Sequence, residues 1–175
     1  MTPTELLDHV ATVVPGAQRV DGEMVRGQAV IVVPRERLAD ALRTLREHPA
    51  LAFEMLSDLT AVDYLGRTPR FEVVYLLYSL SQNHRLRVKV PVPDDDPVVQ
   101  TASTVWKSAT WAEREVWDLF GIRFDGHPDL RRILMYPEFV GHPLRKDYPL
   151  LKRQPLVPER DPIARPWFPR TNGAS

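Results

Sequence analysis

The sheet is most easily recognised in R-F-E-V-V-Y-L-L-Y-S-L-S-Q-N-H-R-L-R-V-K-V, residues 70–90. Its first half, residues 71–80, is apolar on both faces of an extended chain, which is typical of a strand inside a sheet. In residues 85–90 Leu and Val alternate with Arg and Lys, so one face is buried and the other faces water. The intervening S-Q-N-H predicts a turn, and the whole stretch predicts an antiparallel hairpin.

The segments on the N-terminal side of this hairpin predict two helices and several strands. A first helix is expected over residues 4–14, with Thr4 as its N-cap and Pro15-Gly16 as its end. A second helix opens at Pro34 and stops at His48-Pro49, with one apolar face and one charged face. Strands are expected at residues 19–23, where Asp21-Gly22 is a turn signal, at residues 29–33 and at residues 53–64.

The C-terminal side predicts one more helix after a solvated connection at residues 91–97. This third helical region is expected from about Val98, restarts near Ser108 and ends at Gly121, a residue suited to the left-handed position past a helix end. The order of helices and strands predicts an α+β fold, with helices packed on a mostly antiparallel sheet.

The composition changes beyond Gly121, because nine of the 17 prolines lie from Pro128 onward. Proline at this density disfavours helix and central strand and favours extended backbone. The tail also carries large apolar residues such as Trp167 and Phe168, so we expect an extended, Pro-rich C-terminal arm that becomes ordered on another protein. The predicted organisation is an α+β domain at 1–125, an irregular region at 126–150 packed on the domain and a partner, and the arm at 151–175.

Composition excludes several classes of function. The 23 basic and 23 acidic residues cancel, so binding to nucleic acid or to an anionic membrane has no global electrostatic support. The absence of cysteine excludes disulfides, thiolate catalysis and any zinc-thiolate or iron–sulfur site ligated by this chain. The N-terminus has no signal-peptide pattern and the longest apolar run has the length of a strand, so we expect membrane association only through a partner.

Residues 111–148 interleave charged and aromatic side chains, which suggests either a site or an interface. A metal site is one reading, because Glu115 and Asp118 share a helical face and are followed by His127 and His142. Both histidines precede proline in loops, however, and neither has the helical spacing to a carboxylate that such sites use.

Acid–base catalysis by Glu113 and Glu115 is a second reading. Residues two apart on a helix point in different directions, so these carboxylates do not share a proton. The chain also has no nucleophile motif, phosphate loop or dinucleotide fingerprint.

The third reading is an irregular backbone held by ion pairs that presents an interface. Arg114 and Asp118 are expected to pair at i, i+4, and Arg131 and Arg132, just after Asp129, to reach helix carboxylates or a partner's acids. The two histidines are interpreted as hydrogen-bonded structural residues. The same interpretation makes Trp111 and Trp117 packing or interface residues. The residues alone therefore favour an interaction module.

Three blocks in this region carry a family resemblance: E-R-E-V-W-D-L-F-G-I (113–122), G-H-P-D-L-R-R-I-L (126–134) and G-H-P-L-R-K-D-Y-P (141–149). Together they resemble the signature of the C-type, 30 kDa subunit of respiratory complex I, the NADH:quinone oxidoreductase. Residues 56–64, L-S-D-L-T-A-V-D-Y, are similar to the sheet region of that family. The alternatives are the equivalent subunit of a membrane-bound hydrogenase or formate-oxidising complex and, further away, a free-standing metal-dependent enzyme.

The resemblance implies a small domain in the hydrophilic arm of a proton-translocating enzyme, close to the region where quinone is reduced. It implies no cofactor and no catalytic residue in this chain, with FMN and the iron–sulfur clusters in neighbouring subunits. The arm is expected on the large D-type subunit, the 49 kDa homologue, with B- and I-type subunits nearby and no nucleic acid. The expected location is the cytoplasmic side of a bacterial cell membrane, peripheral through the complex.

The residues expected at the subunit interface belong to the three blocks, their surroundings and the tail. They are Trp111, Glu113, Arg114, Glu115, Asp118, Gly121, His127, Pro128, Asp129, Arg131, Arg132, His142, Pro143, Arg145, Lys146, Asp147, Tyr148, Trp167 and Phe168.

Overall fold

A computed structural model describes residues 2–20, 28–151, 153 and 154. Over this part of the chain, helices pack against one five-stranded sheet, and a two-stranded ribbon lies beside it. The sheet order is β1-β2-β5-β4-β3, and the ribbon is β6-β7. The elements in chain order are α1 (Pro3–Val13), β1 (Gln18–Arg19), β2 (Ala29–Val32), the 3-10 turn η1 (Arg35–Arg37), α2 (Leu38–Glu47), β3 (Met55–Asp63), β4 (Phe71–Ser79), β5 (His84–Val92), β6 (Val98–Gln100), α3 (Ala109–Phe120) and β7 (Arg123–Asp125).

The predicted hairpin is confirmed as β4 and β5 in the interior of the sheet. Leu86 pairs with Leu77 and Val88 with Tyr75, so the apolar positions of both strands lie on one face. The same alternation reaches Leu59 on β3, opposite Tyr75. Only β2 and β5 pair in parallel within the described sheet, which confirms an α+β fold on a mostly antiparallel sheet.

The first two helices bury their apolar faces against this sheet. In α2 the periodic residues Leu38, Leu42 and Leu45 are fully buried, as the amphipathic pattern predicts. The predicted cap of α1 is wrong by two residues: Thr2, and not Thr4, is the N-cap. Thr2 and Glu5 form a reciprocal capping box, with Pro3 at the first helical position, so the helix begins earlier.

The prediction of helix from Val98 is wrong. Residues 98–100 form the strand β6, which pairs in parallel with β7 at residues 123–125. The partner strand follows α3, so a non-local pairing overrides the local helical pattern. The helix proper begins at Ala109 and ends, as predicted, before Gly121.

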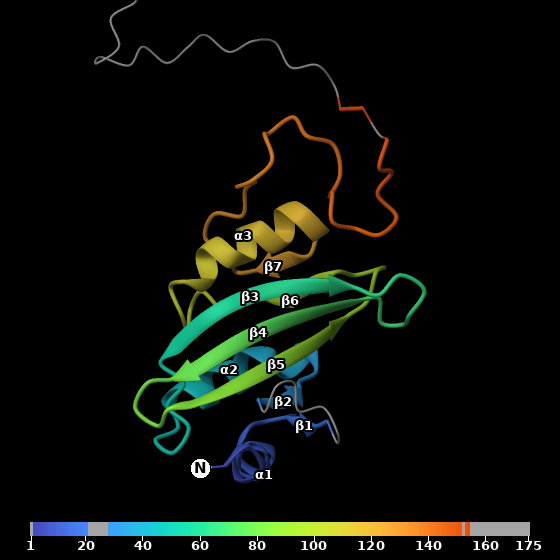
Figure 1. The fold of residues 1–175 in the computed structure, drawn as a ribbon. Helices are drawn as coiled ribbons and strands as arrows, with labels where there is room; N and C mark the ends of the chain where they lie inside the picture. Colours follow the sequence, from blue (N-terminus) through green and yellow to red (C-terminus); the bar gives the residue numbers. More distant parts are fainter. Residues whose placement is uncertain (1, 21–27, 152, 155–175) are drawn as a thin grey trace, which may run out of the picture.

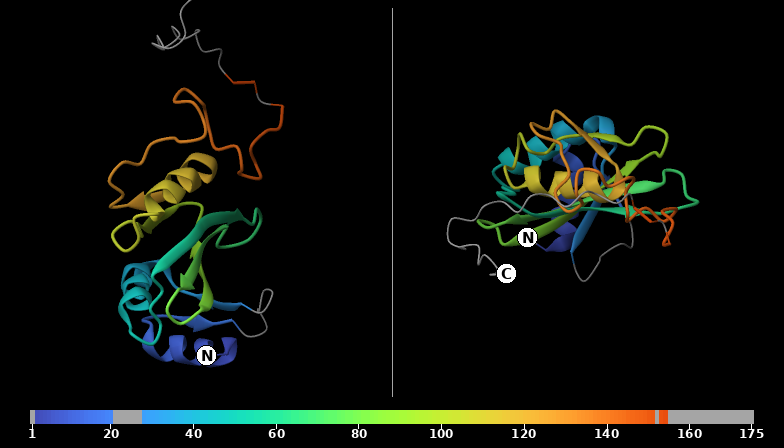
Figure 2. Two further views of the ribbon diagram at one scale, coloured as in Figure 1. Left: turned by 60° about the vertical axis from the view of Figure 1, so that its left-hand side comes forward. Right: turned by 90° about the horizontal axis from the view of Figure 1, so that it is seen from above.

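Figure 1 shows α1 at one end of the molecule and α3 at the other, beyond the β3 edge of the sheet, with α2 behind the strands. The irregular segment after β7 lies outside α3, and the left view of Figure 2 places it there as well. We call residues 126–151 the C-terminal segment. No helix among the described residues is long and apolar enough to cross a membrane. The predicted Asp21-Gly22 turn and residues 155–175 of the predicted arm lie outside the described residues.

Candidate interface around the charged motif

The helix α3 carries the centre of the site, because its apolar residues Val116, Leu119 and Phe120 are buried in the common core. Gly121 ends it with φ 78°, a left-handed conformation that L side chains rarely adopt. A Cβ at this position would lie 2.6 Å from Cδ2 of His142. Glycine is therefore favoured at position 121 for two reasons: its positive φ and the close approach of the C-terminal segment.

The last carbonyl groups of α3 have no partner within the helix, and the C-terminal segment supplies donors for three of them. Nδ1 of His142 donates to the Asp118 carbonyl at 3.0 Å, and the Leu144 N–H donates to the Leu119 carbonyl at 3.0 Å. Nε of Arg145 donates to the Phe120 carbonyl at 2.7 Å and brings a cation to the negative end of the helix dipole. The G-H-P-L-R block is thus a cap built from a distant part of the chain.

His142 is a neutral donor in this cap. Burial lowers its pKa, and the nearby Arg132 and Arg145 lower it further. Because a carbonyl oxygen can only accept, the ring proton is on Nδ1. This histidine is therefore structural, as its position in a His-Pro turn suggested.

Asp118 has a fully buried side chain that organises the first part of the segment. Its Oδ2 accepts hydrogen bonds from three successive backbone N–H groups, those of residues 133–135, at 3.1, 2.9 and 2.8 Å. Its Oδ1 accepts from Nη1 of Arg132 at 2.5 Å. Burial alone would raise its pKa, but the bonds from Met135 and Arg132 hold that pKa below its ordinary value.

The arginines of the motif mostly bind backbone carbonyls. Arg132 donates to the carbonyls of Phe139 and Gly141 at 2.9 and 3.1 Å. The predicted pair between Arg114 and Asp118 is wrong, because Arg114 donates to the carbonyls of Arg131 and Arg132 at 3.1 and 3.0 Å instead. Irregular backbone has no ladder of its own, so guanidinium groups with several donors satisfy it.

Arg131, unlike Arg132, forms an ion pair with Asp129 at 2.9 Å, and both side chains are exposed. Exposed pairs of this kind contribute little stability. The prediction that Arg132 reaches a helix carboxylate is confirmed through Asp118, whereas Arg131 turns toward solvent.

Glu113 is a second fully buried carboxylate of α3, and its partners are neutral. It accepts from the Thr101 hydroxyl and from the Ala102 N–H, both at 2.6 Å. Burial raises its pKa to about 7, against the opposing effect of these two hydrogen bonds. The bonds attach the turn after β6 to the helix.

Nε2 of His127 lies 4.0 Å from Oε2 of Glu113. Both ring nitrogens of His127 have hydrogen-bond partners. The Asp129 N–H donates to Nδ1 at 3.0 Å, so Nδ1 carries no proton. Nε2 therefore carries the proton and donates to the Thr110 carbonyl at 3.0 Å. Both predicted structural histidines are hydrogen-bonded in this way.

Arg70 forms a further cluster that the sequence did not reveal. It is buried at the start of β4 and binds Asp63 through two parallel bonds of 2.9 and 2.8 Å. It also donates to Asp94 at 2.9 Å and to Asp147 at 2.8 Å, and Asp63 accepts from the Lys146 N–H at 2.8 Å. The bonds to Arg70 lower the pKa values of Asp63 and Asp147. The R-K-D block is thereby fastened to the sheet.

A signal for this cluster was present in β3. Asp63 follows Leu59 and Ala61 at the inward-facing positions of the strand, where a charge requires a partner. The identity of that partner depends on three segments meeting at one end of the sheet, which no local pattern shows.

The side chains considered as metal ligands do not form a ligand set among the described residues. Asp118 is saturated by Arg132 and three N–H groups, and Glu115 is exposed on the helix surface. Within the described residues no group of three His, Asp or Glu side chains is arranged to hold a metal ion. Glu113 and Glu115 also differ in environment, one buried and one exposed, so they form no acid–base pair.

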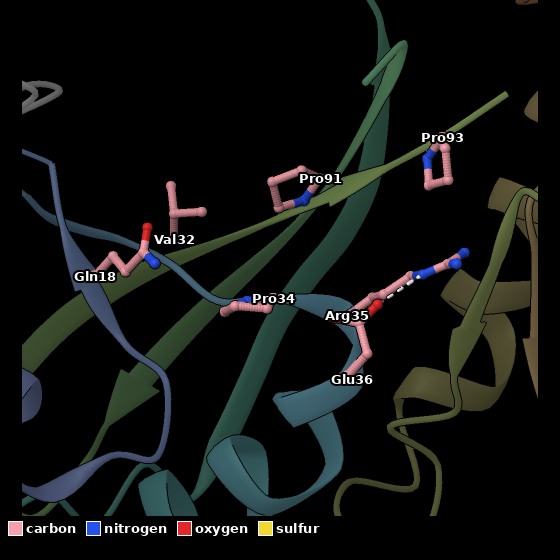
Figure 3. Close-up of a pocket in the computed structure, with 7 residues that line it drawn as sticks. All are labelled: Gln18, Val32, Pro34, Arg35, Glu36, Pro91 and Pro93. Atoms are coloured by element: carbon pink, nitrogen blue, oxygen red, sulfur yellow. Dashed lines mark hydrogen bonds and ion pairs between the residues drawn. The ribbon is translucent and has the colours of Figure 1, made fainter. Parts of the chain in front are cut away.

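A pocket of about 370 Å³ lies elsewhere, where β1, β2 and η1 meet the end of β5 (Figure 3). Three of its lining residues are prolines, and Arg35 at its margin is already paired with Asp96 at 2.9 Å. None of the predicted interface residues that the structure describes lines it.

The outer surface of the C-terminal segment carries large apolar side chains between exposed charged ones, although its inner contacts are polar. Large apolar side chains are exposed at 37% to 100% along it: Leu134, Tyr136, Val140, Leu144, Leu150 and Leu151. Fixed irregular backbone with exposed apolar side chains is typical of a surface that another protein covers. Of the remaining predicted positions, Pro128, Pro143, Lys146 and Tyr148 belong to this segment, and Trp167 and Phe168 lie outside the described residues.

Comparison with known proteins decides the family. Residues 31–154 match the model of the family described as respiratory-chain NADH dehydrogenase, 30 Kd subunit. The chain belongs to this family. It is 51% identical over 147 residues to the C subunit of the NADH-quinone oxidoreductase of Geobacter sulfurreducens, covering 83% of this chain and 86% of the relative. It is 48% identical to a C subunit, numbered 2, of the NADH-quinone oxidoreductase of Rhizobium meliloti, over 80% of this chain and 79% of the relative.

Solved structures agree with the family assignment. A trypsin-resistant fragment (1-134) of Nqo5 is 37% identical, with a TM-score of 0.61, over 74% of this chain and all of the fragment. A chain of the membrane-bound sulfane sulfur reductase, an archaeal respiratory membrane complex, is 27% identical, with a TM-score of 0.70, over 85% of this chain and 86% of that one. The 30 kDa family member described here is thus a subunit of an NADH-quinone oxidoreductase, and its partners are other subunits of that complex.

Proposed function

We propose that this chain contributes no catalytic group and serves as an assembly subunit in the peripheral arm of a proton-translocating NADH:quinone oxidoreductase. The observation that carries the proposal is the C-terminal segment, which is fastened to the domain by Asp118, Arg132 and Arg70 and exposes several large apolar side chains. A segment held this firmly can present a preformed surface, which reduces the entropy lost on association.

The partner that we propose for this surface is the large D-type subunit, the 49 kDa homologue, close to the quinone-reducing region. The B- and I-type subunits are the proposed further neighbours. In this arrangement FMN and the iron–sulfur clusters lie in other subunits, and electrons pass from NADH to quinone without a group from this chain. The lack of cysteine supports that division, because iron–sulfur clusters are bound mainly by thiolates.

The proposed location is the cytoplasmic side of a bacterial cell membrane, reached through the complex. Attachment through partner subunits is consistent with a neutral net charge, which gives anionic lipids no general attraction.

Removal of residues 151–175 tests the assembly role. We expect a variant ending at Leu150 to fold, because the described core lies upstream, and to be lost from the purified complex. The measurement is purification of the native complex through a tag on another subunit, with this chain quantified by mass spectrometry. Equal recovery of the full-length and shortened chains would contradict the role of the arm, and stoichiometric flavin or iron in the isolated full chain would contradict the non-catalytic role.

A second candidate is the equivalent subunit of a different membrane-bound respiratory complex, such as a hydrogenase or formate-oxidising complex. The similarity to a chain of the archaeal sulfane sulfur reductase, a different respiratory membrane complex, supports this second candidate. The same purification separates the two: an NADH-oxidising, FMN-containing partner supports the first candidate, and a complex without one supports the second.

A further inference from the structure

A second pocket, of about 240 Å³, lies between the edge strand β3 and the helix α3. Its lining combines apolar surface with two carboxylates and includes no lysine or arginine. The lining residues are Leu56, Ser57, Asp58, Leu59, Ser108, Trp111, Ala112, Glu115 and Ile133. Ile133 continues this pocket into the exposed apolar surface of the C-terminal segment, where Leu134 is 55% exposed.

Local geometry explains why two carboxylates face the same hollow. The pairing of β3 with β4 skips Ser57, so this bulge leaves Ser57 and Asp58 as successive exposed residues at the sheet edge. Trp111 and Glu115 are separated by one helical turn and lie on the same face of α3.

Neither of these carboxylates has an ion-pair partner among the contacts of the described residues. Glu115 makes no ion pair or hydrogen bond among the contacts of the described chain, and Asp58 accepts only the neighbouring Leu59 N–H, at 2.8 Å. Arg114 donates to the backbone of residues 131 and 132 and does not line the pocket. Two negative charges therefore border one partly apolar hollow whose lining includes no lysine or arginine.

Trp111 adds the third feature, because its indole is 63% exposed at the margin of the pocket. The Arg114 guanidinium lies 5.1 Å from the centre of this ring, which helps to fix its orientation. Tryptophan is one of the residue types that are enriched among the energetically dominant residues of protein–protein interfaces.

We infer that this pocket receives an arginine side chain from a partner subunit of the complex. A planar guanidinium has several N–H donors to offer to the carboxylates at this pocket, and its apolar stem can pack on lining residues such as Leu56 and Ile133. The inference rests on the proposed function, since it requires a partner subunit on this face. It adds a second point of contact, chemically distinct from the apolar surface of the C-terminal segment.

Photo-crosslinking in the assembled complex tests the inference directly. Trp111 is replaced by p-benzoylphenylalanine in the full chain, the complex is purified and irradiated, and the crosslinked peptide is identified by mass spectrometry. We expect a peptide of another subunit that contains an arginine close to the crosslinked position. A crosslink to residues 155–175 of this same chain, or to a peptide without arginine, would overturn the inference.

Charge reversal supplies an independent measurement. We expect D58K/E115K to lower recovery of the chain in the complex more than tenfold, because a cation would meet two cations. The matched control is E47K/D95K, which makes the same change in net charge at exposed positions outside the pocket and should assemble as the wild type does. Equal recovery of the two variants overturns the inference alone, whereas absence of the wild-type chain from the complex overturns the proposed function. Unfolding of the isolated variant chains shows whether either substitution harms the fold.

Discussion

At the scale of single residues, the two buried carboxylates of α3 show how their partners determine charge. Asp118 receives three backbone N–H bonds and a guanidinium, so it stays ionised. Glu113 receives one hydroxyl and one N–H, and the imidazole 4.0 Å away donates its proton to a carbonyl. Desolvation therefore prevails at Glu113, and its pKa rises to about 7.

Replacing this carboxyl by an amide, E113Q, should make the fold less sensitive to pH. The folded protein holds the Glu113 proton more tightly than the unfolded chain does, so the stability from this group is complete below pH 4.5 and is lost as the pH rises through about 7. Gln does not titrate, so the wild type alone loses this stability as the pH rises. We therefore expect the free energy of unfolding of E113Q, relative to that of the wild type, to increase between about pH 5 and pH 8, by at most about 3 kcal/mol. Urea titrations of both full chains check this, and a constant difference at all pH values would contradict it.

At the scale of elements, the end of α3 depends on residues more than twenty positions away. Gly121 and the helix before it were predictable, because apolar periodicity and a left-handed glycine are local signals. The donors that satisfy the last carbonyls, His142 and Arg145, were not, since they arrive on irregular backbone with no periodicity. The strand β6 was missed for the same reason, because three residues become a strand only when β7 lies beside them.

The substitution G121A tests this packed helix end. Alanine at φ 78° costs about 1–2 kcal/mol from the left-handed backbone alone. Its Cβ would also displace the His142 ring, so we expect a further ~1–3 kcal/mol from overpacking. The control is G66A, where φ is 89° and no atom lies within 4 Å of the new Cβ, so it carries the backbone cost without the clash.

Thermal and urea unfolding of G121A and G66A give the comparison. The double variant G121A/H142A should recover part of the loss, because the clashing ring is gone. Equal destabilisation by G121A and G66A would show that the contact with His142 carries no energy.

At the scale of the whole molecule, Arg70 joins the sheet to the C-terminal segment. Asp63 and Arg70 are buried at the end of the sheet, and Asp147 brings the segment to them. The sequence predicted that residues 126–150 pack on the domain but not this anchor, because its three carboxylates come from β3, the loop after β5 and the segment itself. Only their convergence in space makes a site.

Two substitutions separate the roles of this anchor. R70M leaves the fully buried Asp63 side chain without its cation, so we expect it to destabilise the domain by about 3–5 kcal/mol. D147N removes a partner that is half exposed, worth at most about 1 kcal/mol, so global unfolding should change little. Its effect should appear locally, as faster hydrogen exchange at the Lys146 amide, which bonds to Asp63, and at the Leu144 amide, which bonds to the end of α3. If D147N lowered the melting temperature as much as R70M, the C-terminal segment and the domain would unfold as one unit. Unchanged hydrogen exchange at both amides would show that Asp147 does not hold the C-terminal segment in place.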